Sequence, residues 1–327
     1  MGTLPELTGP PRRLPAGWRV VAAKEIADHV LSVRFVVLLV LLGLVAVGTV
    51  YAASGPIRDA AQEAAEDAAP FLQLFTLAPE GVPTFLTLIA FLAPLLGIAL
   101  GFDSVNGERA QGTLPRLLSQ PIHRDDVVNG KFLAGITVIG LLLAGLTVVV
   151  AGVGIVRLGV VPSVSEALRL AVWLLVTVVY VAFWLGFAAL CSVAVRRAAT
   201  SALIAIGVWL AFTLFDGLLA GLLADAIAPV PDEPTADEVL RNARLEQNLA
   251  RVSPSTLYEE ATLALLDPEV RTVGVVLLTQ VDRAVRSALS LEQSLLLAWP
   301  QTVGLAALTV VSFAAAYLLF MRQEIRA

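Results

Sequence analysis

Residues 83–131 read PTFLTLIAFLAPLLGIALGFDSVNGERAQGTLPRLLSQPIHRDDVVNGK, in which an apolar run is followed by a polar insert of about thirty residues. About twenty residues of α-helix are enough to cross the ~30 Å hydrocarbon core of a bilayer. A second long apolar run begins at Phe132. The pattern predicts two membrane-spanning helices joined by a polar connection.

The composition of the whole chain extends this prediction. Hydrophobic residues make up 57% of the 327 residues, charged residues make up 15%, and the mean hydropathy is +0.83. Such values exclude an ordinary soluble domain. Because backbone hydrogen bonds must close within each segment in lipid, we expect an all-α, polytopic membrane protein with six transmembrane helices. The six apolar runs lie at 35–53, 83–102, 132–156, 168–192, 200–222 and 299–321.

Basic residues are distributed unequally between the two ends of these runs. The N-terminal 34 residues, the insert at 103–131, the Arg196-Arg197 pair and the C-terminal tail together carry thirteen of them. The short loops on the opposite side carry three. Because cytoplasmic loops are enriched in Lys and Arg, we expect a multi-pass protein of the cell membrane with both termini in the cytoplasm.

Four regions follow from this topology. Residues 1–34 hold a cytoplasmic tail and an amphipathic helix, which lies in the inner membrane interface or packs on another element. Residues 35–222 hold spans one to five, with the insert at 103–131 between spans two and three. We expect residues 223–298 to form a small outer helical region, and residues 299–327 to form span six and a short tail.

The outer segments carry helix signals of their own. Alanines and acidic residues in 54–82 predict a short solvated helix that ends near Pro70. Ser253-Pro254 is expected to begin a helix that stops at Asp267-Pro268.

A further pair, Ser290 and Gln293, has the spacing of a capping box in front of the last span. The residues before it leave an alternative open, since 272–297 is also compatible with a re-entrant or interfacial hairpin.

The insert contains the residues that we expect to act in function. Thr113 can cap a short helix, Pro115 fits its first turn, and Pro121 ends it. Three leucines on this helix share one apolar face between charged flanks, which predicts a protein partner. An inner loop that only needs basic residues and a turn would give a similar pattern. The candidate residues are Glu108, Arg109, Gly112, Thr113, Leu114, Leu117, Leu118, Pro121, Arg124 and Lys131.

These residues resemble the permease subunits of ABC-2 type ATP-binding-cassette exporters, and most of all the NosY-like branch, through the order ER, GTL, LLS, P, a basic residue and GK. The resemblance implies that the insert holds a coupling helix, which docks on a separate ATPase subunit, and that the N-terminal amphipathic helix is an elbow helix. It also implies two permease copies with two ATPase subunits. Arg124 and Lys131 either share the coupling role or anchor the chain at the membrane interface.

No catalytic or cofactor-binding pattern is present in the sequence. Gly130-Lys131 is followed by Phe132 and has no glycine five residues before Gly130, so it is not a phosphate-binding loop. We therefore expect ATP to be bound and hydrolysed by another chain. One cysteine and two histidines give no metal-ligand spacing, and we expect no cofactor, no metal and no nucleic-acid partner.

Two glycine pairs with the spacing GxxxG lie in spans two and five. They are Gly97 with Gly101 and Gly217 with Gly221. Since glycine lets two helix backbones approach closely, these pairs are candidates for the contact between two permease copies. The alternative is that they pack helices within one subunit.

Polar residues are rare within the spans, which argues against an ion-coupled carrier or a membrane-embedded enzyme. Thr87, Thr213 and Asp216 are the candidates for a substrate path, and Asp216 could instead be a wetted residue near the outer interface. We expect the membrane half of an ATP-driven exporter. An apolar path suits a lipid or a hydrophobic drug, whereas the resemblance to the NosY-like branch implies delivery of sulfur or copper to an enzyme outside the cytoplasm.

Overall fold

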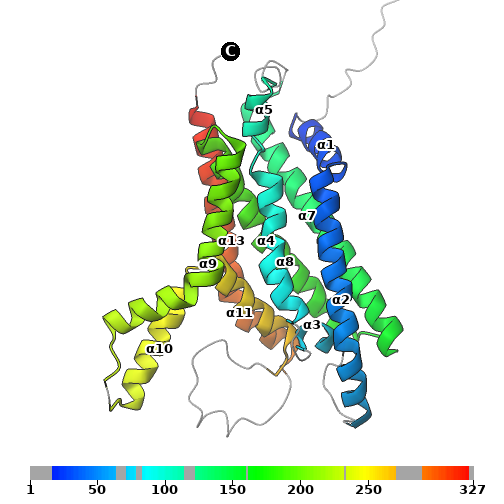
Figure 1. Ribbon diagram of the computed structural model, residues 1–327, viewed down its shortest axis with the longest axis vertical. Helices are drawn as coiled ribbons and strands as arrows, with labels where there is room; N and C mark the ends of the chain where they lie inside the picture. The colour runs from blue at the N-terminus through cyan, green and yellow to red at the C-terminus, as the bar shows by residue number, and fades with distance from the viewer. Residues whose placement is uncertain are drawn as a thin grey trace, which may run out of the picture.

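The computed structural model describes residues 17–63, 71–78, 83–113, 122–159, 161–231, 233–269 and 289–323. All regular secondary structure in these ranges is helical (Figure 1). The helices are α1 (Gly17–Val30), α2 (Val33–Glu63), α3 (Gln73–Thr76), α4 (Phe85–Gly101), α5 (Asn106–Ala110), α7 (Arg124–Leu158), α8 (Val164–Ala194), α9 (Ala198–Ile227), α10 (Ala236–Ala250), α11 (Pro254–Leu266) and α13 (Leu291–Arg322).

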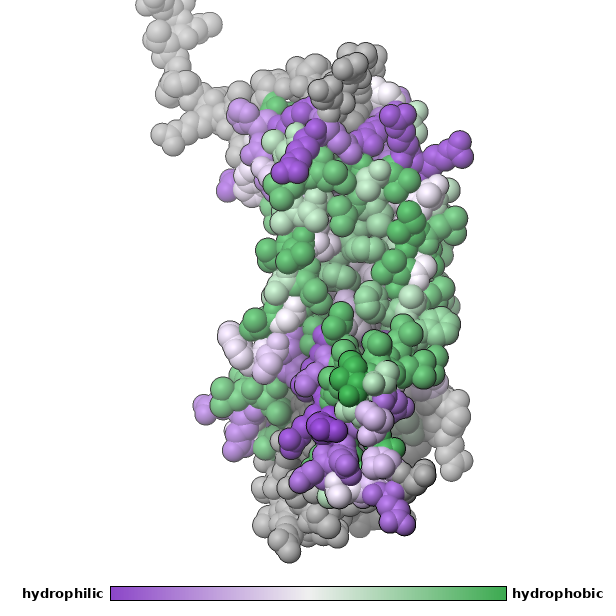
Figure 2. All heavy atoms as spheres, turned by 90° about the vertical axis from the view of Figure 1, so that its left-hand side faces the viewer, coloured by the Kyte–Doolittle hydropathy of each residue, from purple (hydrophilic) through white to green (hydrophobic). Residues whose placement is uncertain are grey.

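Six of these helices are long and apolar enough to cross a membrane, namely α2, α4, α7, α8, α9 and α13. Five of them contain the predicted run, and α4 covers all but the ends of 83–102, so the all-helical class and the six candidate spans are confirmed. Figure 2 shows an apolar band on one face of the molecule, with hydrophilic residues gathered above and below it. The chain is a multi-pass membrane protein with six candidate spans.

Two helices begin eight residues earlier than hydropathy predicted. Helix α7 begins at Arg124, where the carboxylate of Asp126 accepts a hydrogen bond from the backbone N–H of His123 at 3.1 Å. Helix α13 begins at Leu291, and the predicted capping box of Ser290 with Gln293 is confirmed by hydrogen bonds of 3.0 and 3.3 Å. Capping therefore sets these helix starts, while the apolar run sets only the part that can lie in lipid.

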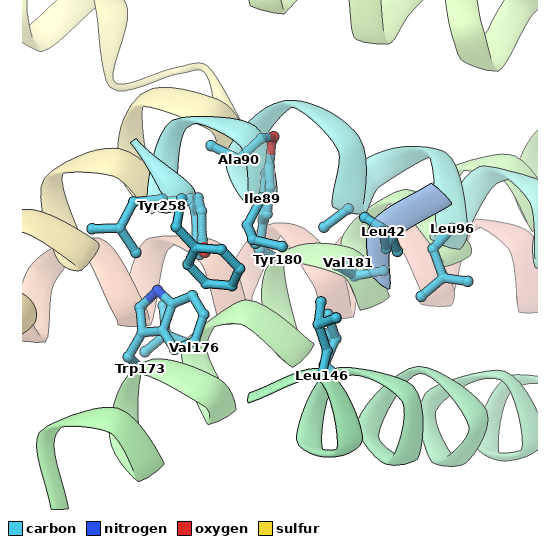
Figure 3. Close-up of a cluster of buried hydrophobic side chains, with 14 of the residues drawn as sticks. Leu42, Ile89, Ala90, Leu96, Leu146, Trp173, Val176, Tyr180, Val181 and Tyr258 are labelled. Atoms are coloured by element: carbon cyan, nitrogen blue, oxygen red, sulfur yellow. The ribbon is translucent and has the colours of Figure 1, made fainter. Parts of the chain in front are cut away.

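Helix α8 forms the centre of the bundle. It packs against α4, α7, α9, α11 and α13, and its large side chains Trp173, Tyr180 and Trp184 are fully buried. Trp173 and Tyr180 are drawn among the buried side chains of Figure 3. Helix α4 approaches it closely at Gly97 and Gly101. The hydroxyl group of Tyr180 donates to the carbonyl oxygen of Ala90 on α4 at 3.1 Å, so the contact is polar as well as apolar.

The first outer segment differs from its prediction. Helix α2 continues through residues 54–63 instead of giving way to a separate solvated helix, and the predicted end near Pro70 lies outside the described residues. Phe71 and Phe75 are then fully buried around α3. Glu166 of α8 holds this segment in place, because its carboxylate accepts the backbone N–H of Phe71 at 3.0 Å.

The second outer segment contains the predicted helix from Pro254 to Leu266, and this element is confirmed as α11. Most of its residues are buried, and it packs against α8, α13 and α4. Tyr258 stacks on Tyr180 with ring centroids 4.3 Å apart (Figure 3). Helix α10, which we did not predict, projects beside the end of α9 (Figure 1). The segment 272–288 lies outside the described residues.

Candidate functional site

The first half of the polar insert forms the short helix α5 and the turn that follows it. Glu108 and Arg109 lie on this helix. Gly112 adopts φ 65°, a left-handed conformation that glycine reaches without strain. The hydroxyl group of Thr113 donates back to the carbonyl oxygen of Glu108 at 3.3 Å. The remaining predicted residues of the coupling helix, Leu114, Leu117, Leu118 and Pro121, lie outside the described residues.

Lys131 joins the insert to two other helices. Its ammonium group lies 2.8 Å from the carboxylate of Glu108 on α5 and 2.9 Å from that of Glu25 on α1. The side chains of Lys131, Glu25 and Glu108 are only 10%, 11% and 17% exposed. Because Lys131 belongs to α7, this buried ion triad connects α1, α5 and α7 at a single point.

The charges of the triad determine the ionisation of Glu25. Burial alone would raise the pKa of its carboxyl group, but the charge and hydrogen bond of Lys131, followed by those of Lys24, outweigh burial and lower this pKa below its ordinary value. Lys24 contributes from the surface, with its ammonium group 3.1 Å from Glu25. Glu25 is therefore ionised at neutral pH, as an ion pair with Lys131 requires.

Helix α1 is held against α7 by close backbone contact as well as by charge. A Cβ atom on Gly130 would lie 2.7 Å from the Cβ of Val21 and 2.9 Å from the carbonyl oxygen of Trp18. Val21 and Ala22 are buried, as expected for the apolar face of an amphipathic helix. Val30, at the end of the helix, is 42% exposed. Helix α1 thus packs on α7 along its first part only.

A second set of hydrogen bonds joins α5 to the C-terminal end of α13. The guanidinium group of Arg109 donates to the side-chain oxygen of Gln323, and that of Arg124 donates to the backbone oxygen of Gln323 at 3.4 Å. The amide of Gln323 in turn donates to the carbonyl oxygen of Val193 on α8 at 2.8 Å. Ser192 accepts the backbone N–H groups of Val105 and Asn106, both at 3.1 Å.

The structure therefore brings Glu108, Arg109, Arg124 and Lys131 together at one end of the bundle. Sequence reasoning missed their partners Glu25, Ser192 and Gln323. A signal existed for Glu25, because it lies three to four residues after Val21 and Ala22 and so shares their buried face. A carboxylate on a buried face needs a buried cation, and Lys131 is one of two lysines in the chain.

The two glycine pairs have different surroundings. A Cβ atom on Gly97 would lie 2.5 Å from the carbonyl oxygen of Val181, and one on Gly101 would lie 2.6 Å from that of Leu185. Both glycines therefore face α8 of their own chain, as the alternative prediction describes. Gly217 has no atom of another residue within 4 Å of its Cβ position, and Gly221 has only the side chain of Glu246 at 3.5 Å.

The three candidates for a substrate path do not share one cavity. Thr87 lines a cavity of about 310 Å³ between α4 and α11. Thr213 donates to the carbonyl oxygen of Trp209 in its own helix at 2.8 Å. Asp216 accepts a hydrogen bond from Thr256 of α11 at 2.5 Å. Within the ranges that the structure describes, no group of three His, Cys, Asp or Glu residues is placed to hold a metal ion.

The family of the chain follows from comparison with known proteins. Residues 19–325 match the family described as ABC-2 family transporter protein, and the chain belongs to this family. It is a permease subunit of an ATP-binding-cassette transporter. Permease subunits of this kind lack the catalytic ATPase, so the chain is not itself the enzyme and requires an ATPase partner.

Two curated relatives are similar to most of the chain. One is described as probable ABC transporter permease protein NosY of Pseudomonas aeruginosa, with 30% identity over 222 residues, which are 64% of this chain and 72% of the relative. The other carries the same description in Stutzerimonas stutzeri, with 29% identity over 213 residues, 62% of this chain and 69% of the relative. The predicted resemblance to ABC-2 permeases is confirmed.

Proposed function

We propose that this chain is the membrane half of an ATP-driven exporter, in which the insert at 103–131 receives the movement of the ATPase subunit. The observation that carries this proposal is the buried ion triad of Glu25, Glu108 and Lys131, which fixes α5 to α1 and α7. A displacement of the insert would be transmitted directly to α1 and α7 through this ion triad. The hydrogen bond of Arg109 to Gln323 adds α13 to the same rigid unit.

The proposed topology assigns the triad to the cytoplasmic side. Helix α1, helix α5 and the C-terminal end of α13 lie at the same end of the molecule (Figure 1). These are the segments whose basic residues favour the cytoplasm. Helix α1 then acts as an elbow helix at the inner membrane boundary. Helices α3, α10 and α11, from the loops 54–82 and 223–298, lie at the opposite end and face the outside.

The proposed assembly contains two permease copies that meet through α9. Gly217 is open, and large apolar side chains surround it on the exposed face of α9, among them Leu214, Leu218 and Leu222. A stripe of this kind permits close approach of a second helix. Gly97 and Gly101 are not part of this proposal, because α8 occupies their faces.

The apolar face of the insert supplies the test for docking of the ATPase. Burying one leucine contributes about 1.5–3 kcal/mol, so the loss of Leu117 should remove much of a modest interface. We expect Leu117→Asp to leave the permease inserted in the membrane but unable to retain its ATPase subunit during purification.

The matched control is Leu31→Asp, a leucine that is 82% exposed between α1 and α2. It adds the same charge near the same membrane boundary but lies outside the insert, so the ATPase should be retained. Equal retention by Leu117→Asp and the unaltered protein would refute docking through this face.

A further inference from the structure

A groove of about 310 Å³ lies where α1 turns into α2, on the side that faces α4. Its lining combines charged residues with the apolar side chains of Val33 and Leu100. The charged or titratable side chains in the lining are Asp28, His29, Arg34 and Asp103. The residues of the insert that contact α13, Arg109 and Arg124, are not part of this lining.

The groove lies at the level where the polar end of the molecule meets its apolar part. Ser32 ends α1 and begins α2, because its hydroxyl group donates to the carbonyl oxygen of His29 at 2.7 Å and accepts the backbone N–H of Phe35 at 3.2 Å. Beside it, the side chains of Leu31 and Val33 are 82% and 78% exposed. A candidate membrane span begins at Val33, so these side chains lie at the edge of the hydrocarbon.

The guanidinium group of Arg34 is oriented so that it can bind an anion. Its guanidinium group lies 2.5 Å from the carboxylate of Asp103 and 4.9 Å from the centre of the Phe102 ring, while its side chain is 56% exposed. Guanidinium carries five N–H donors in a rigid fork. The bond to Asp103 and the ring contact therefore fix its orientation and leave donors free for a phosphate group.

Asp28 supplies a separate negative charge in the lining of the groove. Its side chain is 59% exposed, and among the described residues it pairs with Lys24 of the same helix, at 2.9 Å. Burial, which is the largest effect, lowers the pKa of His29 below its ordinary value, so this imidazole adds no positive charge at neutral pH. The groove thus offers one guanidinium group to an anion and an accessible carboxylate to a cation.

We propose that this groove binds the headgroup of a phospholipid that carries both a phosphate and a primary ammonium, with the phosphate on Arg34 and the ammonium on Asp28. The exposed side chains of Leu31 and Val33 accommodate the start of the acyl chains. A headgroup with only negative charge makes no favourable contact with Asp28, and a quaternary ammonium cannot donate a hydrogen bond to it. The proposal concerns the permease alone and does not depend on the proposed export function.

The proposal is tested by the lipids that the purified permease retains. The protein is exchanged from detergent into an equal mixture of phosphatidylethanolamine, phosphatidylcholine and phosphatidylglycerol with identical acyl chains, and bound lipid is counted by native mass spectrometry. We expect phosphatidylethanolamine to be retained about fivefold over phosphatidylglycerol, the effect of roughly one charged contact near a membrane surface. Equal retention of the three lipids would overturn the proposal.

Variants separate the two halves of the site. Asp28→Asn should reduce phosphatidylethanolamine to the level of phosphatidylglycerol, whereas Lys24→Gln breaks the same surface ion pair and should keep the preference. Arg34→Gln should reduce all three lipids, and Arg19→Gln, on an exposed arginine of α1, should not. Asp28→Asn disturbs only an exposed pair, so its result does not depend on a change in stability.

Inorganic phosphate distinguishes a lipid site from a site for a free anion. The shared chemistry is a phosphate group on Arg34, but a lipid gains further contact from its acyl chains. We expect millimolar inorganic phosphate to leave the bound phosphatidylethanolamine in place. Complete displacement by inorganic phosphate, or unchanged lipid retention in both Asp28→Asn and Arg34→Gln, would contradict a phospholipid site.

Discussion

Lys131 lies between Glu25 and Glu108 with only a tenth of its side chain exposed. Removing one member of a buried ion pair leaves the others charged and without compensation, which costs about 3–5 kcal/mol. We expect Lys131→Met to lower the free energy of unfolding by this amount, measured by denaturant titration in mixed micelles.

Lys24 offers the control for this prediction. Its side chain is 58% exposed, so water reaches the Lys24 end of its pairs with Glu25 and Asp28. Exposed pairs contribute about 0–1 kcal/mol, so Lys24→Met should have a small effect. If both substitutions destabilise the protein equally, the triad does not hold the helices together.

Glu25 should make part of the free energy of unfolding depend on pH. Its folded-state pKa is lowered, because Lys131 and Lys24 outweigh the effect of burial. A carboxyl group of this kind contributes its full stabilisation above the unfolded-chain pKa of about 4.3. That contribution is lost as the pH falls through the lower folded-state pKa. We expect Glu25→Gln to show a smaller loss of unfolding free energy on acidification than the unaltered protein, and parallel pH profiles would count against the ion pair.

Two glycine-containing helices pack in different ways. Helix α4 contacts α8 through Gly97, where a Cβ atom would meet a backbone carbonyl oxygen at 2.5 Å, whereas Gly217 of α9 has open space. Overpacking costs about 1–3 kcal/mol. We expect Gly97→Ala to lower the thermal unfolding temperature and Gly217→Ala to leave it unchanged.

A larger side chain at Gly217 tests the dimer proposal without disturbing the monomer. Gly217→Ile should reduce cysteine crosslinking between the α9 helices of two copies, while its unfolding temperature stays within the range of Gly217→Ala. Unchanged crosslinking would show that the copies meet elsewhere.

The elements were predictable to the extent that they depend on local sequence. Ser290 with Gln293 marked a helix start correctly, because a capping box involves residues only three positions apart. Ser253-Pro254 also marked one correctly, because proline is favoured in the first turn of a helix. The burial of Phe71 was not predictable, since it depends on a hydrogen bond to Glu166, 95 residues later. The buried face of α1 indicated that Glu25 needs a cation, but its pairing with Lys131, 106 residues away, depends on the tertiary structure. Hydropathy gave the spans, but tertiary contacts decided which charged residues meet.

At the scale of the whole molecule, the segments rich in basic residues gather at one end and α10 and α11 lie at the other (Figure 1). This arrangement predicts a result for labelling in intact cells. A membrane-impermeant thiol reagent should reach a cysteine placed at Asp237, which is exposed on α10, but not one placed at Gln111, which is exposed after α5. The native Cys191 is buried and can be replaced beforehand. Labelling with the opposite pattern would invert the proposed topology.

The movement of α1 with the insert is the most direct consequence of the proposed coupling. Spin labels at the exposed positions Arg19 on α1 and Gln111 after α5 report the distance across the triad by pulsed electron resonance, in the complex with its ATPase. In the unaltered protein we predict one narrow distance that is the same with and without ATP, because Lys131 makes the two segments a single rigid unit. In the Glu108→Ala protein we predict a broad distance distribution. A distance that changes on ATP binding in the unaltered protein, or a distribution that Glu108→Ala leaves narrow, would contradict coupling through this junction.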